Sequence, residues 1–533
     1  MTASASDERR PLLDENAPED AGKPKVNLLA VFIPMTLGIF LAAVDQTIVV
    51  ASYAAIGSDL KELQKTSWIA TSYMLTLTSF QPLYGKLSDI FGRKACLLTA
   101  YCIFCVGSVL CGLSRTMDEL IYSRALTGVG GGGMSTVVSI IMSDVVPLRE
   151  RGTWQGILNI VFATGSGVGA PLGGLLADTI GWRWAFLLQA PIALLAIVSV
   201  SIALHMPTVD TTDFSTKIKR VDFAGAFTLV ATLFFFLFGV ERGGNVAWDD
   251  KQTIGALIIA AVAFVLFGFI EMEWAREPLA PKRIIVNRSL IASYLCNFFC
   301  IAAMMPILFY VSLYVQAVQG ASPSRAGLFF IPSVAAGVAG SLLGGLYIQS
   351  RGIYYTLTVL AYGLQVAGTI VVVLGSGLVF TGLGILIPGL VAASLGNGTG
   401  ITTSLISLIA NAGAADQAIA TAVSYLFRSL GSVLGLSIGS TLVQTTLRGA
   451  LRAKLDGRDV DEIIANVRHS LTYIKTLPPD VAHAVRASYE EAIQACFLFA
   501  LGMAFCAFSA SWFIREVPLG KAAVERREEE QTQ

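Results

Sequence analysis

The stretch GKLSDIFGRK, residues 85–94, is a short charged turn between two apolar runs. A similar stretch, GLYIQSRG at residues 345–352, follows another apolar run at an offset of 260 residues (85 to 345). Glycines spaced four apart also recur, at an offset of 266 residues (165 to 431), as Gly165, Gly169, Gly173 and as Gly431, Gly435, Gly439. Features that recur at nearly one offset indicate that the chain contains a duplicated unit.

The apolar runs on either side of these stretches continue along almost the whole chain. Of the 533 residues, 54% are hydrophobic and 14% are charged, whereas a soluble domain has about 25% charged residues. Runs of about 20 apolar residues are long enough to cross a bilayer, and they do not alternate as β-barrel strands would. We therefore expect an all-α polytopic membrane protein, with spans near residues 28–51, 67–86, 95–113, 119–142, 155–177, 182–204, 222–240, 253–272, 289–316, 325–347, 354–375, 379–409, 416–444 and 492–514.

The duplication divides these fourteen spans into two six-helix halves with two extra helices between them. Such halves are typical of transporters, whose substrate site lies near the middle of the membrane between the halves. The predicted parts are a tail (1–27), an N-terminal bundle (28–206), a linker with the extra helices (207–288), a C-terminal bundle (289–514) with a long non-cytosolic loop (445–491), and a second tail (515–533). Lys and Arg are richer in the loops on the side of the two tails, which predicts that both tails are cytosolic.

The sequence gives no indication of an enzyme, a cofactor or a metal. The eight cysteines lie in apolar segments without a CxxC pair, and His205, His469 and His483 are scattered. The glycines of residues 128–133 match a dinucleotide-binding pattern, but they lie inside an apolar span rather than after a strand. The net charge is zero, so nothing suggests nucleic-acid binding.

Four stretches resemble motifs of the major facilitator superfamily. GKLSDIFGRK resembles the loop signature of this family, and YSRALTGVGGGG (122–133) resembles its fourth-helix motif, which has an arginine within the membrane. GSGVGAPLGG (165–174) is similar to the fifth-helix motif of its antiporters, and AVDQTIVVAS (43–52) to the first-helix signature of the fourteen-span drug:proton antiporter branch. The whole chain resembles the fungal vacuolar basic amino acid transporters of this branch.

The resemblance implies two groups of residues that control conformation. In the family, the charged turn latches the two halves in the outward-facing state, which assigns this role to Gly85, Asp89, Gly92, Arg93 and Lys94. A proline flanked by glycines lets the fifth helix bend at the interface between the halves. The residues of this second group are Gly169, Pro171, Gly173 and Gly174.

Charged residues inside spans are costly unless they are paired or hydrated, so they are functional candidates. Asp45 and Arg124 are expected at similar depths in the outer half of the membrane, where Asp45 would carry the proton and Arg124 would tune it. The alternative is a static buried pair. Asp416 is expected to be solvated at a cytosolic helix end, and Arg428 either lines the substrate cavity or binds backbone carbonyls.

Further polar and aromatic residues could line the cavity. Tyr73, Thr76 and Phe80 share one helical face, and Asn159, Gln189 and Asn297 are amides within spans. Each of these six could instead hold helices together.

The N-terminal tail carries a short pattern, Glu8 followed by Leu12 and Leu13, in a segment too polar to pack. This pattern matches an acidic dileucine sorting signal, for which a cytosolic adaptor would be the partner. Together with the resemblance, it favours the vacuolar membrane.

We therefore expect a monomeric proton-coupled antiporter that moves lysine, arginine and histidine from the cytosol into the vacuole. Its partners would be the substrate, protons and the lipid bilayer. The alternative is an efflux pump for a drug, toxin or secondary metabolite in the plasma membrane, and a sensor on the same fold is a third possibility. Asp45 is the clear anion within the spans, so the charges alone do not favour a cationic substrate.

Overall fold

The computed structural model describes residues 28–60, 67–147, 150–204, 222–245, 248–273, 287–320, 330–377, 383–413, 416–455 and 477–517. Within these ranges the chain is helical. The helices are α1 (Leu28–Asp59), α2 (Ser67–Phe91), α3 (Arg93–Leu113), α4 (Met117–Val145), α5 (Arg151–Thr179), α6 (Arg183–Leu187), α7 (Gln189–Ala203), α9 (Phe223–Asn245), α10 (Lys251–Glu273), α12 (Arg288–Ala317), α14 (Phe330–Arg351), α15 (Tyr355–Gly375), α16 (Leu383–Ala412), α17 (Gln417–Lys454) and α19 (Pro479–Ser511).

The helices confirm an all-α polytopic membrane fold. Thirteen segments of the described chain are long and apolar enough to cross a membrane, and α6 and α7 together form one of them. The helix α2 is also 25 residues long, but Gln81, Lys86 and Asp89 make it more polar. With α2 added to the thirteen, the helices correspond to the fourteen expected spans.

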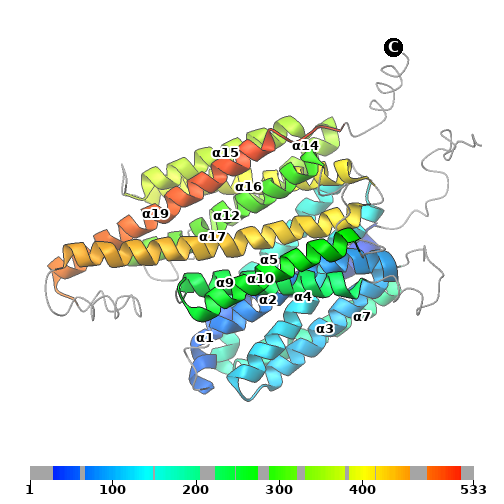
Figure 1. Ribbon diagram of the computed structural model, residues 1–533, viewed down its shortest axis with the longest axis horizontal. Coiled ribbons are helices and arrows are strands. Elements are labelled where there is room, and N and C mark those ends of the chain that lie inside the picture. The colour runs from blue at the N-terminus through cyan, green and yellow to red at the C-terminus, as the bar shows by residue number, and fades with distance from the viewer. Residues whose placement is uncertain are drawn as a thin grey trace, which may run out of the picture.

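The helices of each half pack mainly against one another. In the first half, α1 packs on α5, α4 packs on α2 and α3, and α7 packs on α3; in the second, α12 packs on α17 and α19, and α16 packs on α14 and α15. Contacts between the halves run from α5 to α14 and from α2 to α17. Figure 1 shows the first half in blue and cyan, and the second half runs from green at α12 to red at α19.

The two extra helices, α9 and α10, form a hairpin beside the contact between the halves. The helix α9 packs against both α2 and α17, and α10 packs against α9. Figure 1 shows this hairpin in green alongside the long yellow α17. Apolar side chains of α10, including Phe264 and Val265, are exposed, as expected of a helix that faces lipid.

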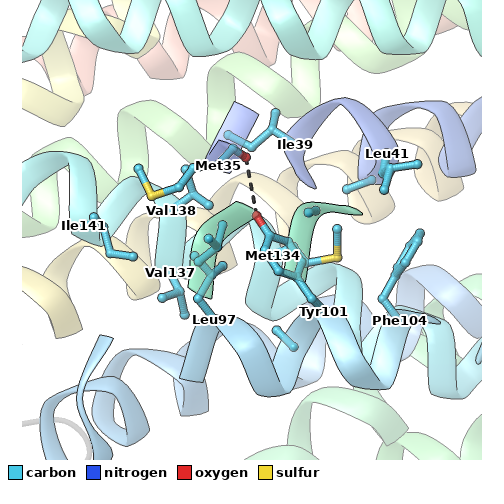
Figure 2. Packing of buried hydrophobic residues seen from close by; sticks show 14 of the residues in the cluster. Met35, Ile39, Leu41, Leu97, Tyr101, Phe104, Met134, Val137, Val138 and Ile141 are labelled. Atoms are coloured by element: carbon cyan, nitrogen blue, oxygen red, sulfur yellow. Dashed lines mark hydrogen bonds between the residues drawn. The ribbon is translucent and has the colours of Figure 1, made fainter. Parts of the chain in front are cut away.

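A dense apolar cluster holds the first half together. It includes Met35 and Ile39 of α1, Leu97 and Phe104 of α3 and Val137 of α4, all buried (Figure 2). The Tyr101 hydroxyl donates a hydrogen bond to the Met35 carbonyl at 3.5 Å, drawn as the dashed line in Figure 2. Phe80, a predicted cavity residue, is partly buried against this cluster.

The segment expected to be a long loop at residues 445–491 is partly helical. The helix α17 continues to Lys454, and α19 already begins at Pro479. Their extended ends are joined by an ion pair between Lys454 and Glu491 at 3.0 Å. The helical parts outside the apolar layer are polar, and hydropathy does not distinguish them from a loop. The predicted spans 416–444 and 492–514 were therefore shorter than α17 and α19. The sorting pattern at Glu8, Leu12 and Leu13 lies outside the described residues.

Candidate functional site

Asp45 of α1 and Arg124 of α4 form an ion pair inside the first half. The Arg124 guanidinium nitrogen Nη1 lies 2.8 Å from Asp45 Oδ1 and 2.7 Å from Asp45 Oδ2. Both side chains are buried, with 0% and 1% exposure. The sequence expectation that these residues lie at one depth is consistent with this contact.

Three further residues contact the same ion pair. Gln189 of α7 donates from Nε2 to Asp45 Oδ1 at 3.1 Å, and Arg124 donates from Nε to the Ile69 carbonyl of α2 at 3.2 Å. The ring of Tyr73 lies 4.4 Å from the guanidinium carbon, and a cation next to an aromatic face is stabilised. The pair therefore links four helices of one half, namely α1, α2, α4 and α7.

This arrangement can respond to a proton. The buried Asp45 carboxylate accepts three hydrogen bonds and has a cation beside it. Protonation of Asp45 would remove its charge and leave Arg124, which remains cationic, without its anion. Loading Asp45 with a proton would thus disturb all four helices at once.

The charged stretch at 85–94 was expected to be a turn, but it forms the end of α2, Gly92 and the start of α3. Its side chains form a network at the face expected to be cytosolic. Arg93 Nη1 donates to Asp89 and to Ser88, and Arg93 Nε donates to Asp144 Oδ2 of α4 at 2.8 Å. Asp144 Oδ1 in turn accepts from Gln417 Nε2 of α17 at 3.1 Å. A hydrogen-bonded connection from this stretch to the second half therefore runs through Asp144.

The remaining members of the turn have other contacts. Lys94 Nζ donates to the Ser201 carbonyl of α7 at 2.7 Å. Gly92 has φ +91°, a conformation that side chains other than glycine rarely adopt. Gly85 faces α17, where an added methyl group would lie 2.7 Å from the Ala422 side chain. Gly85 thus permits close packing of α2 on α17.

Further contacts between the halves lie on the same side. Thr153 of α5 donates to Gln349 of α14 at 2.9 Å, and Asn159 Nδ2 donates to Ser341 Oγ at 2.6 Å. Ser429 of α17 donates to Gln81 of α2 at 3.0 Å. These three contacts involve six residues on four helices, α2, α5, α14 and α17. The contacts hold the two halves together between α5 and α14 and between α2 and α17.

The two glycine rows pack at corresponding places in the two halves. A methyl group at Gly169 or Gly173 of α5 would collide with backbone carbonyls of α1, at Val44 and Ile48. Gly435 of α17 likewise approaches the Ala302 backbone of α12. Small residues allow helix backbones to approach closely in membranes. Pro171 and Gly174 lie in the same helix as Gly169, and α5 continues through the proline.

The predicted cavity residues do not form one group. Tyr73 and Gln189 belong to the ion-pair site, and Asn159 joins the two halves. Thr76 donates to the Ala125 carbonyl of α4 at 2.7 Å, and Asn297 donates to the Ser293 carbonyl of its own helix at 2.9 Å. Both side chains are buried.

Two charged residues of α17 differ from each other in their surroundings. Asp416, at the N-terminal cap position of α17, is 5% exposed. The expectation of a solvated side chain was therefore wrong, because this helix end is buried within the protein. Arg428 is half-buried, and its guanidinium carbon lies 5.1 Å from the Tyr425 ring centroid. Among the described residues, we find no group of three or more metal-ligating side chains.

Sequence reasoning missed Asp144, Gln417 and Ser341. Asp144 lies two residues beyond the expected end of its span at residue 142. It was therefore not counted among the charged residues within the membrane. Asp144 and Arg93 were both expected near the cytosolic face, and their opposite charges could have predicted that they pair. Gln417 and Ser341 are neutral, and nothing local distinguishes them from other polar residues in spans.

Comparison with known proteins gives a consistent set of relatives. A model of the Major Facilitator Superfamily matches residues 35–436. The vacuolar membrane amino acid uptake transporter fnx2 of Schizosaccharomyces pombe is 40% identical over 92% of this chain and 85% of its own length. The multidrug resistance protein fnx1 of the same yeast is 36% identical, over 92% and 93%.

A third relative and a solved structure extend the comparison. Vacuolar basic amino acid transporter 1 of Saccharomyces cerevisiae is 34% identical over 79% of each chain. The crystal structure of the human organic anion transporter MFSD10 has a TM-score of 0.59 at 15% identity, and the match covers 92% of this chain and 100% of that one. At such low identity this structure supports the fold alone.

Proposed function

Because this chain belongs to the Major Facilitator Superfamily of transporters, we propose that it is a proton-coupled antiporter that moves basic amino acids from the cytosol into the vacuole. The observation that carries the proton coupling is the buried ion pair of Asp45 and Arg124, with Gln189 as a third member. Asp45 is the proton carrier, and Arg124 is the cation that returns it to the ionised form.

The coupling follows from the contacts of the pair and of the latch. The pair links four helices of the first half, while Asp144 connects that half to α17 through Gln417. A proton that reaches Asp45 from an acidic lumen loosens the first half. The latch residues Gly85, Asp89, Arg93 and Lys94 then control how readily the cytosolic face opens.

The substrate class rests on relatives whose names specify amino acids. One is called a vacuolar membrane amino acid uptake transporter and another a vacuolar basic amino acid transporter. These names also support placement in the vacuolar membrane, to which the pattern at Glu8, Leu12 and Leu13 would direct the chain. We further propose that the protein acts as a monomer, with bundles at 28–206 and 289–514.

A second candidate is efflux of drugs or other organic compounds by the same cycle. The observation that favours it is the multidrug resistance protein at 36% identity, which covers as much of this chain as the amino acid transporter does. Both candidates share the fold and the proton step. They differ in the substrate and in the membrane where the protein works.

Uptake into vacuolar vesicles separates the two candidates. Vesicles from cells that contain or lack the protein are energised with ATP and given labelled lysine, arginine or histidine, with and without a protonophore. We expect uptake that needs the protein and is abolished by the protonophore. Absence of uptake for all three, together with reduced accumulation of an organic cation in whole cells, would replace the amino acid proposal with drug efflux.

A further inference from the structure

Arg428 is a cation near the middle of the membrane. The helix α17 begins at Gln417, and a rise of about 1.5 Å per residue places Arg428 roughly 16 Å along it. The hydrocarbon layer is about 30 Å thick. A charge at this depth is costly unless it is paired or hydrated, so such a residue marks a functional site.

The contacts of Arg428 differ from those of the other embedded arginine. Arg124 uses its donors on Asp45 and on the Ile69 carbonyl. In the described ranges, the contact found for the Arg428 guanidinium is the ring of Tyr425, and no hydrogen bond or ion pair joins it to a carbonyl or carboxylate. The alternative in which Arg428 binds backbone carbonyls therefore lacks support, and its hydrogen-bond donors are available to a ligand.

The register of α17 shows where Arg428 points. Ala422 and Ser429 face α2, where they meet Gly85 and Gln81. Gly435 faces α12, against Ala302. With about 100° between successive residues of a helix, Arg428 lies about 20° from the direction of Gly435, on the edge of the α12 face that is turned toward α2. Since α2 and α12 belong to different halves, Arg428 faces the region between the halves.

The opposite side of α17 is occupied by the extra helices. Thr441 accepts a hydrogen bond from Trp248 Nε1, in the connection between α9 and α10, at 3.3 Å. By the same helical spacing, Thr441 lies outside the sector between the α2 and α12 faces. Arg428 is therefore directed away from the α9–α10 hairpin and from lipid on that side.

We propose that Arg428 binds the carboxylate of the transported substrate. This inference rests on the proposed function and deepens it by naming the group that the site recognises. A guanidinium presents parallel donors that match the two oxygens of a carboxylate. Asp45 and Arg124 neutralise each other, so Arg428 gives the site a positive charge. Every amino acid offers a carboxylate to it, whereas a lipophilic cation does not.

The test compares amino acids with the same molecules lacking the carboxylate. Purified protein in proteoliposomes with an acidic interior takes up labelled lysine, and lysine, arginine, cadaverine and agmatine are added as competitors. For the unchanged protein we expect the two amines to inhibit about 10- to 100-fold more weakly than the amino acids, since hydrogen bonds to a charged group are lost. Arg428→Gln should raise the KM for lysine by a similar factor and bring the ratio between lysine and cadaverine close to one.

Two further variants make the result specific. Arg448→Gln removes an exposed cation from the same helix, and it should leave both KM and the ratio unchanged. Arg428→Lys keeps the charge but not the planar pair of donors, and it should give an intermediate ratio. If Arg428→Gln does not fold, the test rests on Arg428→Lys. An unchanged ratio between lysine and cadaverine in that variant overturns the proposal.

The outcomes separate this proposal from the proposed function. Lysine uptake with a ratio that Arg428→Gln does not alter refutes the role of Arg428 and leaves amino acid transport standing. Uptake of a carboxylate other than an amino acid, dependent on Arg428, refutes amino acid transport and supports the role of Arg428. Uptake of organic cations without any carboxylate substrate refutes both.

Discussion

Replacement of Asp45 by asparagine removes the negative charge from the buried pair and preserves its size. The Asp45 oxygens accept two contacts from Arg124 and one from Gln189, and asparagine retains one acceptor oxygen. Removing one partner of a buried ion pair costs about 3–5 kcal/mol, because the other charge stays buried. With one oxygen retained, we expect a loss near the lower end, about 3 kcal/mol.

Two measurements follow this loss. The Tm of the purified variant should fall by about 3 °C, while the protein remains folded and correctly placed. Lysine uptake driven by an acidic interior should fall to the background of empty liposomes, because asparagine cannot carry the proton. The second change, Arg124→Gln in the Asp45→Asn background, removes the unpaired cation and should restore most of the Tm but none of the pH-driven uptake.

This double variant separates stability from proton coupling. A merely static pair would regain both properties when its second charge is removed. Normal pH-driven uptake by Asp45→Asn alone would exclude Asp45 as the proton carrier. A full loss of folded protein in both variants would show that the pair is structural, and the proton would then need another carrier.

The other predictions concern the latch, the helix contacts and the tail. Asp89→Ala should slow lysine transport, and Asp144→Ala should slow it more, because Asp144 also accepts a hydrogen bond from Gln417 of α17. Equal rates of lysine uptake for the two variants and the unchanged protein would contradict this. Gly173→Ala should lower the Tm by several degrees, since the methyl group meets the α1 backbone, whereas Gly167→Ala on the same helix has nothing within 4 Å and should not. Alanine at both 12 and 13 should move a fluorescent fusion from the vacuolar to the plasma membrane with transport intact, and retention on the vacuole would show that another signal dominates.

Much of the fold could be predicted from the sequence, because the bilayer imposes it. Each span needs about 20 apolar residues, and nearly all of the expected spans correspond to helices of similar extent. The charges within spans were visible for the same reason, since apolar surroundings make them stand out. Asp45 and Arg124 were therefore found as a pair before any distance was known. The ends of α17 and α19 were missed where the helices leave the apolar layer.

Only the tertiary structure decided which polar residues meet. Lipid tails are as apolar as leucine, so hydropathy does not fix the rotation of one membrane helix against the next. The sequence could not show that Gln189 binds Asp45, that Asn159 joins α5 to α14, or that Asp144 links the charged turn to Gln417. These contacts depend on the rotation and depth of whole helices. The sequence determined which segments cross the membrane, and the packing of those helices determined which of their polar side chains come together.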